Sequence, residues 1–436
     1  MNKQFALIIP TCTDFNRGDQ ALVLETKRVI DQVYGNVDTY MMSTGETVQC
    51  EAMGLKKFSD ILKHPSRFDK KGVSNMKYGV WLKVRWGVIA VFDFLISLAI
   101  LNNILRKVLK RFLSKDVLRS IELYENSEAV FVKGGGFLHD YSKGLIGLYS
   151  IYYQTYHIKL ALKMKKSVYI MPNSYGPFKN KSTATMVRKM LSECKFVSAR
   201  ESVSGDGLRN GLGIDIPLYP DLGFFLRSGD KAWAKNYMED LGMIPTDRLV
   251  AITVRPYRFY SYDDPAQKYN DYKDSFVRLI KHLNDNDYRA VLVVHTRAEN
   301  DHENDARCVG EIYDSLPETL KRNVIIVNDN NLNCFDLKAI YGICKYVIGT
   351  RFHSVIFAIE QGIPCIAVTY GGNKGEGIMS DMKLEDYAVD IAHVAGDILV
   401  EKFNKLIDQT QGFKKAASLY VANANERYKE LIREIN

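Results

Sequence analysis

The sequence predicts an α/β protein in which two doubly wound halves face each other across a cleft. Short β-branched runs alternate with helical stretches, the alternation occurs twice, and prolines and glycines separate the two series. The length of 436 residues suits two domains, and the apolar and charged fractions of 46% and 25% are those of an ordinary globular protein. We place the domains at residues 1–225 and 226–436.

The strands are expected where short apolar runs recur. In the first half these runs are residues 5–9, 37–41, 129–133, 167–172 and 196–199. Pro217, Pro220 and Gly223 mark the transition, and Pro245 precedes the second series, which comprises residues 249–254, 290–295, 324–327, 346–348 and 365–368. A helix of residues 22–33 follows the first strand, and a long helix begins at Gly412. The sequence leaves open whether this last helix crosses back over the first half.

Positive charge is concentrated in an insert of the first half. The formal net charge is +8, and residues 70–115 carry ten Lys or Arg against one acid, Asp93, which leaves −1 for the rest of the chain. The insert also contains the apolar run 86–101, which is short for a membrane span of roughly 20 residues. Its basic flanks and Trp81 favour contact with an anionic membrane surface. The alternatives are a helical pair packed on the core and, less favoured, a true span.

Two further features bound the class of protein. Seven scattered cysteines, an odd number with no CxxC pair, argue against a disulfide framework and against a structural zinc site. The chain runs from Met1 into the first strand without a secretory segment, so we expect a cytoplasmic protein. Nucleic acid is not expected as a partner, because the positive charge lies on an apolar segment.

The most informative segment is residues 350–354, Thr-Arg-Phe-His-Ser, which joins two apolar runs. The pattern predicts a strand, a turn and a helix, at the sheet edge where open α/β proteins bind ligands. A helix N-terminus there favours an anion, and Arg351 offers a planar fork to phosphate or carboxylate. His353 can transfer a proton near neutral pH. The alternative is a histidine that caps the helix and an arginine in a surface ion pair.

Polar residues and glycines also follow the other predicted strands. In the first half these are Asn16, Asp19, Gly135, Gly136, His139 and Asn173. In the second half they are Arg255, His295 and Lys374. Each alone is compatible with turn chemistry or surface charge, but the carboxyl ends of parallel strands share one sheet edge. His157 lies in an aromatic-rich helix and is interpreted as structural.

Taken in order, these motifs resemble the polysaccharide pyruvyl transferase family. The resemblance rests on Asn16-Arg17-Gly18-Asp19, Gly134-Gly135-Gly136, Gly176-Pro177, Arg200-Glu201-Ser202, Pro220-Asp221, Thr350-Arg351-Phe352-His353, Gly362-Ile363-Pro364, Tyr370 and Lys374. Residues 45–125 lack the family pattern. Two departures are Gln20, where an acid is common, and Phe352, where leucine is usual.

The resemblance implies two Rossmann-like domains of the GT-B type, with an acceptor domain followed by a donor domain. It implies an enzyme that moves an enolpyruvyl unit from phosphoenolpyruvate to two hydroxyls of a sugar, giving a pyruvate ketal and phosphate. His353 matches the family's proposed acid, which protonates C3 while a hydroxyl attacks C2. Arg351 and Arg255, supported by Lys374, would bind the donor anion. His295 is a further donor-site residue and a competing acid–base candidate.

The resemblance also implies the acceptor and its setting. The acceptor would be a hexose, for example galactose, of a capsular or exopolysaccharide repeat on a polyprenyl-diphosphate carrier. The enzyme would then be peripheral on the inner face of the cell membrane. The residues expected to contact the sugar are Asn16, Asp19, Gly135, Gly136, His139 and Asn173. Phosphoenolpyruvate is a co-substrate, and no metal or redox cofactor is expected.

Two other functions are compatible with the sequence. A GT-B-type glycosyltransferase that uses a nucleotide-sugar would share the architecture and the strand-end cations, but nucleosides rather than phosphoenolpyruvate would protect it from heat. A non-catalytic polysaccharide-binding protein of an export complex would stay functional after His353→Ala.

Overall fold

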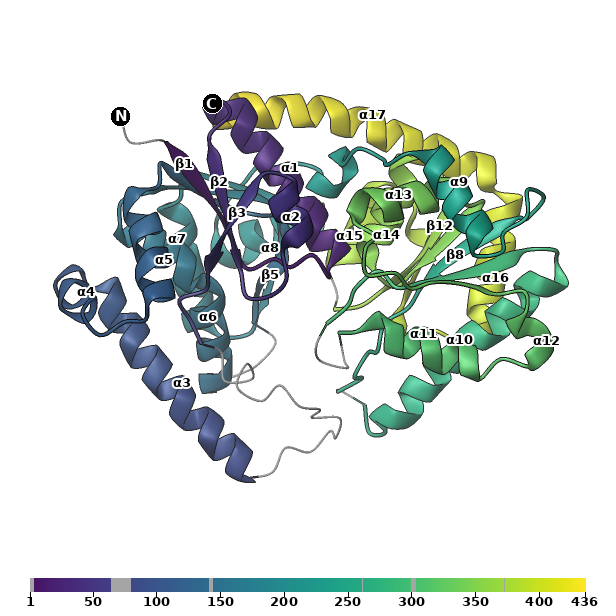
Figure 1. Cartoon of the computed structure of the whole chain (residues 1–436), viewed down its shortest axis with the longest axis horizontal. Helices are drawn as coiled ribbons and strands as arrows, with labels where there is room; N and C mark the ends of the chain where they lie inside the picture. The colour runs from purple at the N-terminus through teal and green to yellow at the C-terminus, as the bar shows by residue number, and fades with distance from the viewer. Residues whose placement is uncertain (1–3, 64–79, 141–143, 261, 299–302, 372) are drawn as a thin grey trace.

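The computed structural model describes residues 4–63, 80–140, 144–260, 262–298, 303–371 and 373–436. At residues 80, 83, 146, 373 and 374 it describes the backbone alone. Two α/β domains stand side by side, and the carboxyl-terminal helix runs over both of them (Figure 1). The predicted fold class is therefore confirmed, and the predicted boundary near residue 225 falls between the two sheets.

The amino-terminal domain is built on a parallel sheet in the order β3-β2-β1-β4-β6-β5, with β7 paired to β6. Its strands are β1 Phe5–Ile9, β2 Asp38–Ser43, β3 Leu55–Ser59, β4 Ala129–Val132, β5 Gly135–Asp140, β6 Ser167–Phe178 and β7 Phe196–Ala199. Its helices are α1 Arg17–Tyr34, α2 Val48–Ala52, α3 Val80–Leu101, α4 Asn103–Leu109, α5 Lys115–Asn126, α6 Gly144–Lys163, α7 Lys181–Ser192 and α8 Ser202–Leu212. The short helix η2 Leu222–Phe225 leads to the second domain.

The carboxyl-terminal domain has a parallel sheet in the order β10-β9-β8-β11-β12-β13. Its strands are β8 Leu249–Thr253, β9 Arg289–Val293, β10 Ile325–Val327, β11 Tyr346–Gly349, β12 Cys365–Thr369 and β13 Ala388–Asp390. Its helices are α9 Lys231–Asp240, α10 Pro265–Asp285, α11 Asp305–Asp314, α12 Glu318–Lys321, α13 Cys334–Gly342, α14 Phe352–Glu360, α15 Asn373–Asp381, α16 Gly396–Asp408 and α17 Thr410–Ile435, with short turns η3 Glu385–Tyr387 and η4 Ile391–His393.

In each sheet the direction in which successive strands are added reverses at one place. In the first sheet β2 lies on one side of β1 and β4 on the other, and in the second sheet β9 and β11 flank β8 in the same way. A crevice forms outside the carboxyl ends of the strands at such a reversal, and open α/β sheets bind their ligands there. The fold therefore provides one ligand-binding edge in each domain.

The predicted strands all overlap observed ones, and the strands that the sequence missed have local causes. Strand β8 is buried along its whole length, as parallel strands covered on both faces are, and gives a clear apolar run. Strand β3 exposes two adjacent lysines and gives no such run. Strand β5 begins inside the triple glycine, and β13 has three residues.

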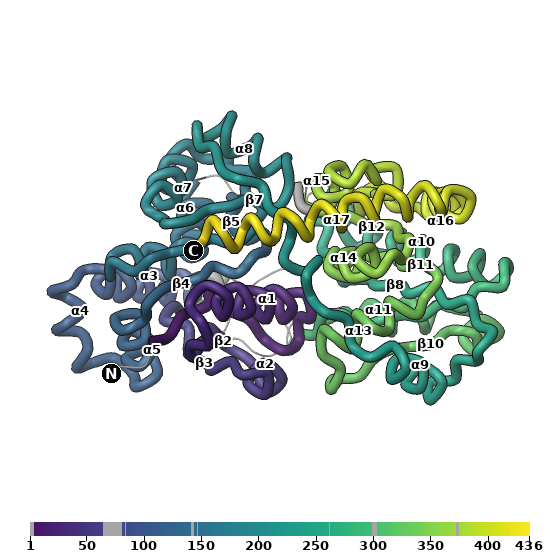
Figure 2. Tube along the Cα trace, turned by 90° about the horizontal axis from the view of Figure 1, so that it is seen from above, coloured from purple at the N-terminus to yellow at the C-terminus, as the bar shows by residue number. Residues whose placement is uncertain are grey.

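Helix α17 joins the domains. It begins on the carboxyl-terminal domain and ends over the amino-terminal one, so it does cross back over the first half (Figure 2). Its residue Glu434 accepts a hydrogen bond from Tyr219, and the Arg28 guanidinium of α1 lies 4.9 Å from the ring centroid of Tyr428. One hydrophobic core extends from the second sheet through η2 and α17 to the α1 side of the first sheet.

A pair of leucines on α17 tests this packing. Leu431 is fully buried and Leu419 is 74% exposed. Leu431→Ala should lower the free energy of unfolding by about 2–5 kcal/mol, because it leaves a cavity in the shared core. Leu419→Ala should change it by less than about 0.5 kcal/mol. Urea unfolding measures both, and equal effects would show that α17 does not pack in this way.

Candidate active site

Four of the residues predicted for the second domain meet at the carboxyl edge of its sheet. Arg255 follows β8, His295 follows β9, and Arg351 is the N-cap residue of α14, which carries His353 in its first turn. The Phe357 ring lies between the two histidines, with its centroid 5.9 Å from that of His295 and 6.3 Å from that of His353. This cluster lies at the reversal between β8 and β11.

Two acids hold Arg351. Its Nη2 donates to Oδ1 of Asp305 at 2.6 Å, and its Nη1 lies 3.3 Å from Oε2 of Glu303. Burial alone would lower the pKa of Arg351, but the facing Asp305, Tyr370 and Glu303 raise it. Arg351 is therefore a permanent cation in a buried ion pair, and not the surface pair of the alternative interpretation.

Arg255 shares one of these acids. Its Nη2 donates to Oε1 of Glu303 at 3.0 Å, and its guanidinium lies 4.3 Å from the ring centroid of Tyr370. The side chain of Glu303 is 42% exposed, whereas that of Asp305 is buried. Glu303 is therefore the acid that an incoming anion can displace, and such a displacement would release donors of both arginines together.

His353 reaches from α14 to the amino-terminal domain. A Cβ atom on Gly18 of α1 would clash with its Nδ1, so the ring packs closely on this glycine. Its Nε2 is buried and lies 3.7 Å from Oδ1 of Asp221. The imidazole thus lies at the junction of the two domains. The glycine on which it packs, Gly18, is followed directly by Asp19 in α1.

Asp221 presents a carboxylate to this imidazole. Arg200 Nη1 donates to its Oδ2 at 2.6 Å, and the backbone N–H of Gly223 donates to its Oδ1 at 2.8 Å. Burial alone would raise the pKa of Asp221, but Arg200, His353 and the Gly223 N–H together hold it well below its ordinary value. Asp221 is therefore ionised throughout the neutral pH range.

The environment of His295 disfavours its charged form, whereas that of Asp221 favours the charged form. It is fully enclosed, and its Nδ1 is hydrogen-bonded to the Tyr341 hydroxyl at 2.9 Å. Burial, reinforced by His353, Arg351 and Arg17, lowers the pKa of His295 well below 6.5. His295 is therefore a neutral imidazole at pH 7. Its Nε2 can form a hydrogen bond to a ligand, but His295 holds no proton to give as a cationic acid.

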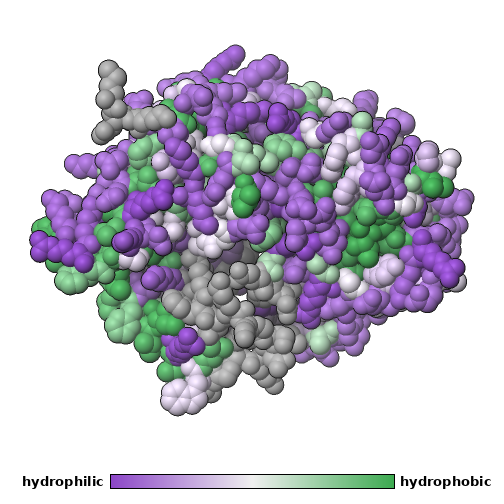
Figure 3. All heavy atoms as spheres, in the orientation of Figure 1, coloured by the Kyte–Doolittle hydropathy of each residue, from purple (hydrophilic) through white to green (hydrophobic). Residues whose placement is uncertain are grey.

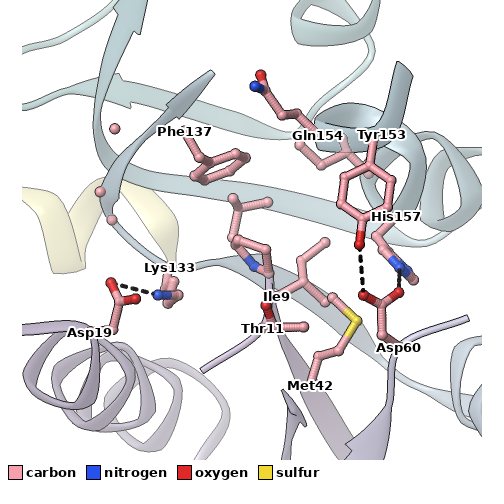
Figure 4. Close-up of a pocket in the computed structure, with 16 residues that line it drawn as sticks. Ile9, Thr11, Asp19, Met42, Asp60, Lys133, Phe137, Tyr153, Gln154 and His157 are labelled. Carbon is pink, nitrogen blue, oxygen red and sulfur yellow. Dashed lines mark hydrogen bonds and ion pairs between the residues drawn. The ribbon is translucent and has the colours of Figure 1, made fainter. Parts of the chain in front are cut away.

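The predicted first-domain residues divide into two groups. Asp19, Gly135 and Gly136 line a pocket of about 380 Å³ at the reversal between β1 and β4, where Asp19 pairs with Nζ of the buried Lys133 at 2.8 Å (Figure 4). Asn16, His139 and Asn173 are not among the described residues that line this pocket.

The second group has separate surroundings. The Asn16 side chain caps α1 and donates to Asp19, and the backbone N–H of His139 donates to Gln154. Asn173 is fully buried, and neither polar atom of its side chain has a hydrogen-bond partner among the described residues. Lys374 lies at the start of α15, and its side chain falls outside the described ones.

Sequence reasoning missed the acids that organise the site. Asp221 and Arg200 belong to motifs that carry the family resemblance, but neither was assigned a role from the sequence. Lys133 was predicted only as the last residue of a strand. Glu303 and Asp305 precede and begin α11 and carried no signal, because only the fold brings them to Arg351, 46 residues from Asp305. Within the described part of the chain, no three His, Cys, Asp or Glu side chains are grouped so that they could hold a metal ion.

Two parallel-sheet domains with ligand-binding edges define a protein of GT-B architecture, and solved structures agree. The chain is similar in fold to S. aureus MnaA solved with UDP (TM-score 0.56, 10% identity, 95% of this chain and 90% of that one). It is also similar to the UDP-forming α,α-trehalose-phosphate synthase of Burkholderia vietnamiensis (TM-score 0.53, 9% identity, 100% and 99%).

The family to which the chain belongs is more specific than its fold. The family model for polysaccharide pyruvyl transferase matches residues 16–372, and the chain belongs to this family. The amylovoran biosynthesis protein AmsJ of Erwinia amylovora is 24% identical over 409 residues, which are 92% of each protein. The resemblance seen in the motifs is thereby confirmed, and the protein is a pyruvyltransferase of polysaccharide biosynthesis.

Replacing Asp221 with asparagine tests the buried anion. Asp221→Asn leaves Arg200 buried without this partner, so at pH 7 the free energy of unfolding should fall by about 3–5 kcal/mol. A carboxylate whose folded pKa lies below the unfolded value of 3.8 stabilises fully above that pH and progressively less below it. The difference in free energy of unfolding between the native protein and the variant should therefore become smaller below about pH 4.

Urea unfolding at several pH values measures this gap. Asp215→Asn is the control, because Asp215 is exposed in its ion pair with Arg209 and the change should be within about 0.5 kcal/mol. A gap for Asp221→Asn that stays constant down to pH 3 would contradict the depressed pKa of Asp221.

Proposed function

We propose that the protein transfers an enolpyruvyl unit from phosphoenolpyruvate to two hydroxyls of a hexose, for example galactose. The products are a cyclic pyruvate ketal on a lipid-linked surface-polysaccharide repeat and phosphate. The observation that carries the proposal is the placement of His353. It faces the carboxylate of Asp221, stands near the two arginines of the second domain, and touches the first domain at Gly18.

The donor is a small dianion or trianion and needs cations. In the proposed complex its carboxylate or phosphate displaces Glu303 and takes the released donors of Arg255 and Arg351 in charge-assisted hydrogen bonds. Asp305 stays in place and keeps the Arg351 guanidinium oriented. Lys374 would add a further cation from α15. The neutral His295 would offer Nε2 to the bound donor.

His353 is the proposed acid. Its imidazole faces the ionised carboxylate of Asp221, and histidine is a side chain suited to proton transfer near neutral pH. His353 would give its proton to C3 of phosphoenolpyruvate while a sugar hydroxyl forms a bond to C2. That hydroxyl loses its own proton, which restores the imidazolium. His295 does not compete for this step, because it is neutral.

Ring closure completes the transfer. The second sugar hydroxyl forms a bond to C2, the C2–O bond to phosphate breaks, and the hydroxyl proton leaves with the phosphate. Arg255 and Arg351 would stabilise the departing anion. No oxidation state changes in either step, so a redox cofactor is not needed, and we propose that Arg255 and Arg351 balance the donor charge without a metal ion.

A phosphate-release assay tests the donor and the acid together. Phosphate release from phosphoenolpyruvate should depend on an added galactoside, and His353→Ala should lower the rate by about 100-fold or more. Phosphoenolpyruvate should still raise the thermal midpoint of this variant, because Arg255 and Arg351 remain. The control is His393→Ala, which changes an exposed histidine of η4.

Other outcomes would redirect the proposal. Thermal protection by a nucleotide-sugar and not by phosphoenolpyruvate would indicate a GT-B-type glycosyltransferase. A His353→Ala variant that restores polysaccharide production in cells would indicate a non-catalytic assembly protein.

We further propose that the protein works at the inner face of the cell membrane, bound through α3 and α4. Many of the apolar side chains of α3 are exposed, including Trp81 and Phe92, and Phe112 after α4 is 80% exposed. Figure 3 shows apolar side chains gathered over this region, at the lower left. Exposed basic residues lie beside them, namely Arg85, Lys107, Arg111 and Lys115. This combination suits an anionic bilayer surface.

Surface contact accounts for α3 better than a span does. Residues Val84–Leu101 have a mean hydropathy of 2.0, so by length and composition they could cross a membrane, and only 11% of these residues are buried. One side of α3 is nevertheless tied to the protein. Ser97 is hydrogen-bonded to the Tyr152 hydroxyl of α6 at 2.7 Å, and Asp93 accepts from the backbone N–H of Lys63 at 2.9 Å. A spanning helix would have to give up these contacts.

Liposome flotation tests the membrane proposal. The protein should float with vesicles that contain anionic lipid, and sodium carbonate at alkaline pH should release it. Phe92→Glu combined with Phe112→Glu should lower the bound fraction at least about tenfold, because two carboxylates would have to enter the interface. Leu419→Glu on α17 is the matched control. Unchanged flotation of the double variant would overturn the proposal, and resistance to carbonate would indicate a span.

A further inference from the structure

A buried arginine at the start of α1 has no acid partner in the described part of the chain. Five arginines are buried there, and four of these are paired with carboxylates, namely Arg106, Arg200, Arg255 and Arg351. The fifth is Arg17, the first residue of α1, which is 3% exposed. A charged group removed from water is costly unless it is paired. Arg17 is therefore a buried cation whose charge no described ion pair balances.

The guanidinium of Arg17 crosses the junction of the two domains. Its Nη2 donates to the backbone carbonyl of Asn330, in the loop between β10 and α13, at 3.0 Å. Its Nη1 donates to the side-chain oxygen of Gln49 at 3.4 Å. Both acceptors are neutral, and a guanidinium has five N–H groups. These contacts thus orient Arg17 toward the carboxyl-terminal domain and leave it with charge and donors for a ligand.

Two acids influence Arg17 without pairing with it. Burial lowers the pKa of Arg17, and the charges of Asp14 and Asp336 oppose this effect. The carboxylate of Asp14 accepts hydrogen bonds from the backbone N–H groups of Gln49 and Cys50, at 2.7 and 3.0 Å. That of Asp336 belongs to the capping box at the start of α13. Both acids therefore hold local backbone in place.

A second arginine approaches Arg17 from the other domain. After burial, the charge of Arg297 is a further cause that lowers the pKa of Arg17. The residue before it, Thr296, forms an antiparallel backbone bridge with Asn16, the residue before Arg17. The Arg297 side chain is hydrogen-bonded to the amide oxygen of Asn328, and it forms no ion pair with a described carboxylate. One arginine from each domain is thus held at this junction without a paired acid.

Two buried polar groups beside these arginines lack hydrogen-bond partners among the described residues. They are Nε2 of His295 and the hydroxyl of Thr296, its neighbour in the chain. Besides burial and His353, the charges of Arg351 and Arg17 lower the pKa of His295, so both guanidiniums lie near this ring. Buried polar groups without partners are rare, and bound water or an ion commonly satisfies them. The region between Arg17 and Arg351 therefore has the charge and the polar groups that suit an anion.

We infer that Arg17 and Arg297 form a second anion subsite for the donor. Phosphoenolpyruvate has two anionic groups, a carboxylate and a phosphate. In this arrangement Arg255 and Arg351 bind one of them, and Arg17 and Arg297 bind the other beside His295. Arginine suits both groups, because its planar fork can form two parallel hydrogen bonds to either. The inference rests on the proposed transfer from phosphoenolpyruvate, and it makes donor binding depend on both domains.

The affinity for phosphoenolpyruvate, measured by isothermal titration calorimetry on the full chain, tests the inference. Arg17→Met should raise the Kd at least about tenfold, because methionine fills similar space without the charge or the N–H donors. The thermal midpoint of the unliganded variant should not fall, because the variant no longer buries an unpaired charge. A purely structural role of Arg17 predicts the opposite pattern, a lower midpoint with an unchanged Kd, and would overturn the inference.

Arg28→Met is the matched control. Arg28 lies on the same helix and also contacts the element that joins the domains, since its guanidinium packs on Tyr428 of α17. Its side chain is 42% exposed and is paired with Glu25. The control therefore makes the same substitution and the same change of net charge away from the donor site. Its Kd for phosphoenolpyruvate should remain close to the native value.

A second variant keeps the test decisive if circular dichroism shows that Arg17→Met does not fold. Arg297 is less buried, and Arg297→Met should raise the Kd for phosphoenolpyruvate several-fold. A native-like Kd for folded Arg17→Met, or for Arg297→Met when Arg17→Met is unfolded, would overturn the inference alone.

Inorganic phosphate, titrated in parallel, separates this inference from the proposed function. If the native protein binds phosphate but not phosphoenolpyruvate, the proposed donor is wrong, and the same comparison of variants with phosphate decides whether Arg17 belongs to an anion site. Binding of neither anion to the native protein would overturn both proposals.

Discussion

The buried carboxylate of Asp221 links the fold to the chemistry. Arg200 reaches it from the end of β7, the Gly223 N–H from η2, and His353 from α14 of the other domain. Removing an anion from water is costly, and it is tolerated when every partner is in place. The turn at η2, the packing of α14 on α1 and the orientation of the imidazole are therefore mutually dependent. The continuous core under α17 holds the two domains in the arrangement that this anion requires.

The two halves have the same topology but present different side chains at their sheet edges. In each sheet the winding reverses beside the first strand, and the functional side chains lie at that reversal. The second-domain edge presents arginines, balanced by the displaceable Glu303, and this suits a small anion. The first-domain edge presents glycines, carboxylates and aromatic rings, which suit a neutral polyhydroxyl ligand. His353 lies between them because α14 leaves one edge and packs on the helix that leaves the other.

The sequence predicted the architecture because a buried parallel strand is a continuous apolar run, and the residue after each run must lie at the ligand-binding edge. Arg255, His295 and Arg351 were placed together by this argument alone. It could not assign the acids of the site, since Asp305 reaches Arg351, and Asp221 reaches His353, from distant segments of the chain. For Arg351 the structure shows an ion pair, which is buried and not at the surface, and anion binding stays a prediction. Strand β3 was missed because it has lysines where an apolar run was expected.

The segment that departs from the family pattern connects the pocket to the exposed apolar surface. Helix α6 carries Tyr153 and His157 into the pocket, and the neighbouring Tyr152 and Tyr156 are hydrogen-bonded to Ser97 of α3. If α3 lies on the bilayer, the pocket wall is fixed to the membrane-bound element through one helix. A sugar on a lipid diphosphate would be presented close to that surface, so the pocket and α3 would recognise two ends of one acceptor. Variation in this segment would then change the polysaccharide that is modified, while the donor edge stays the same.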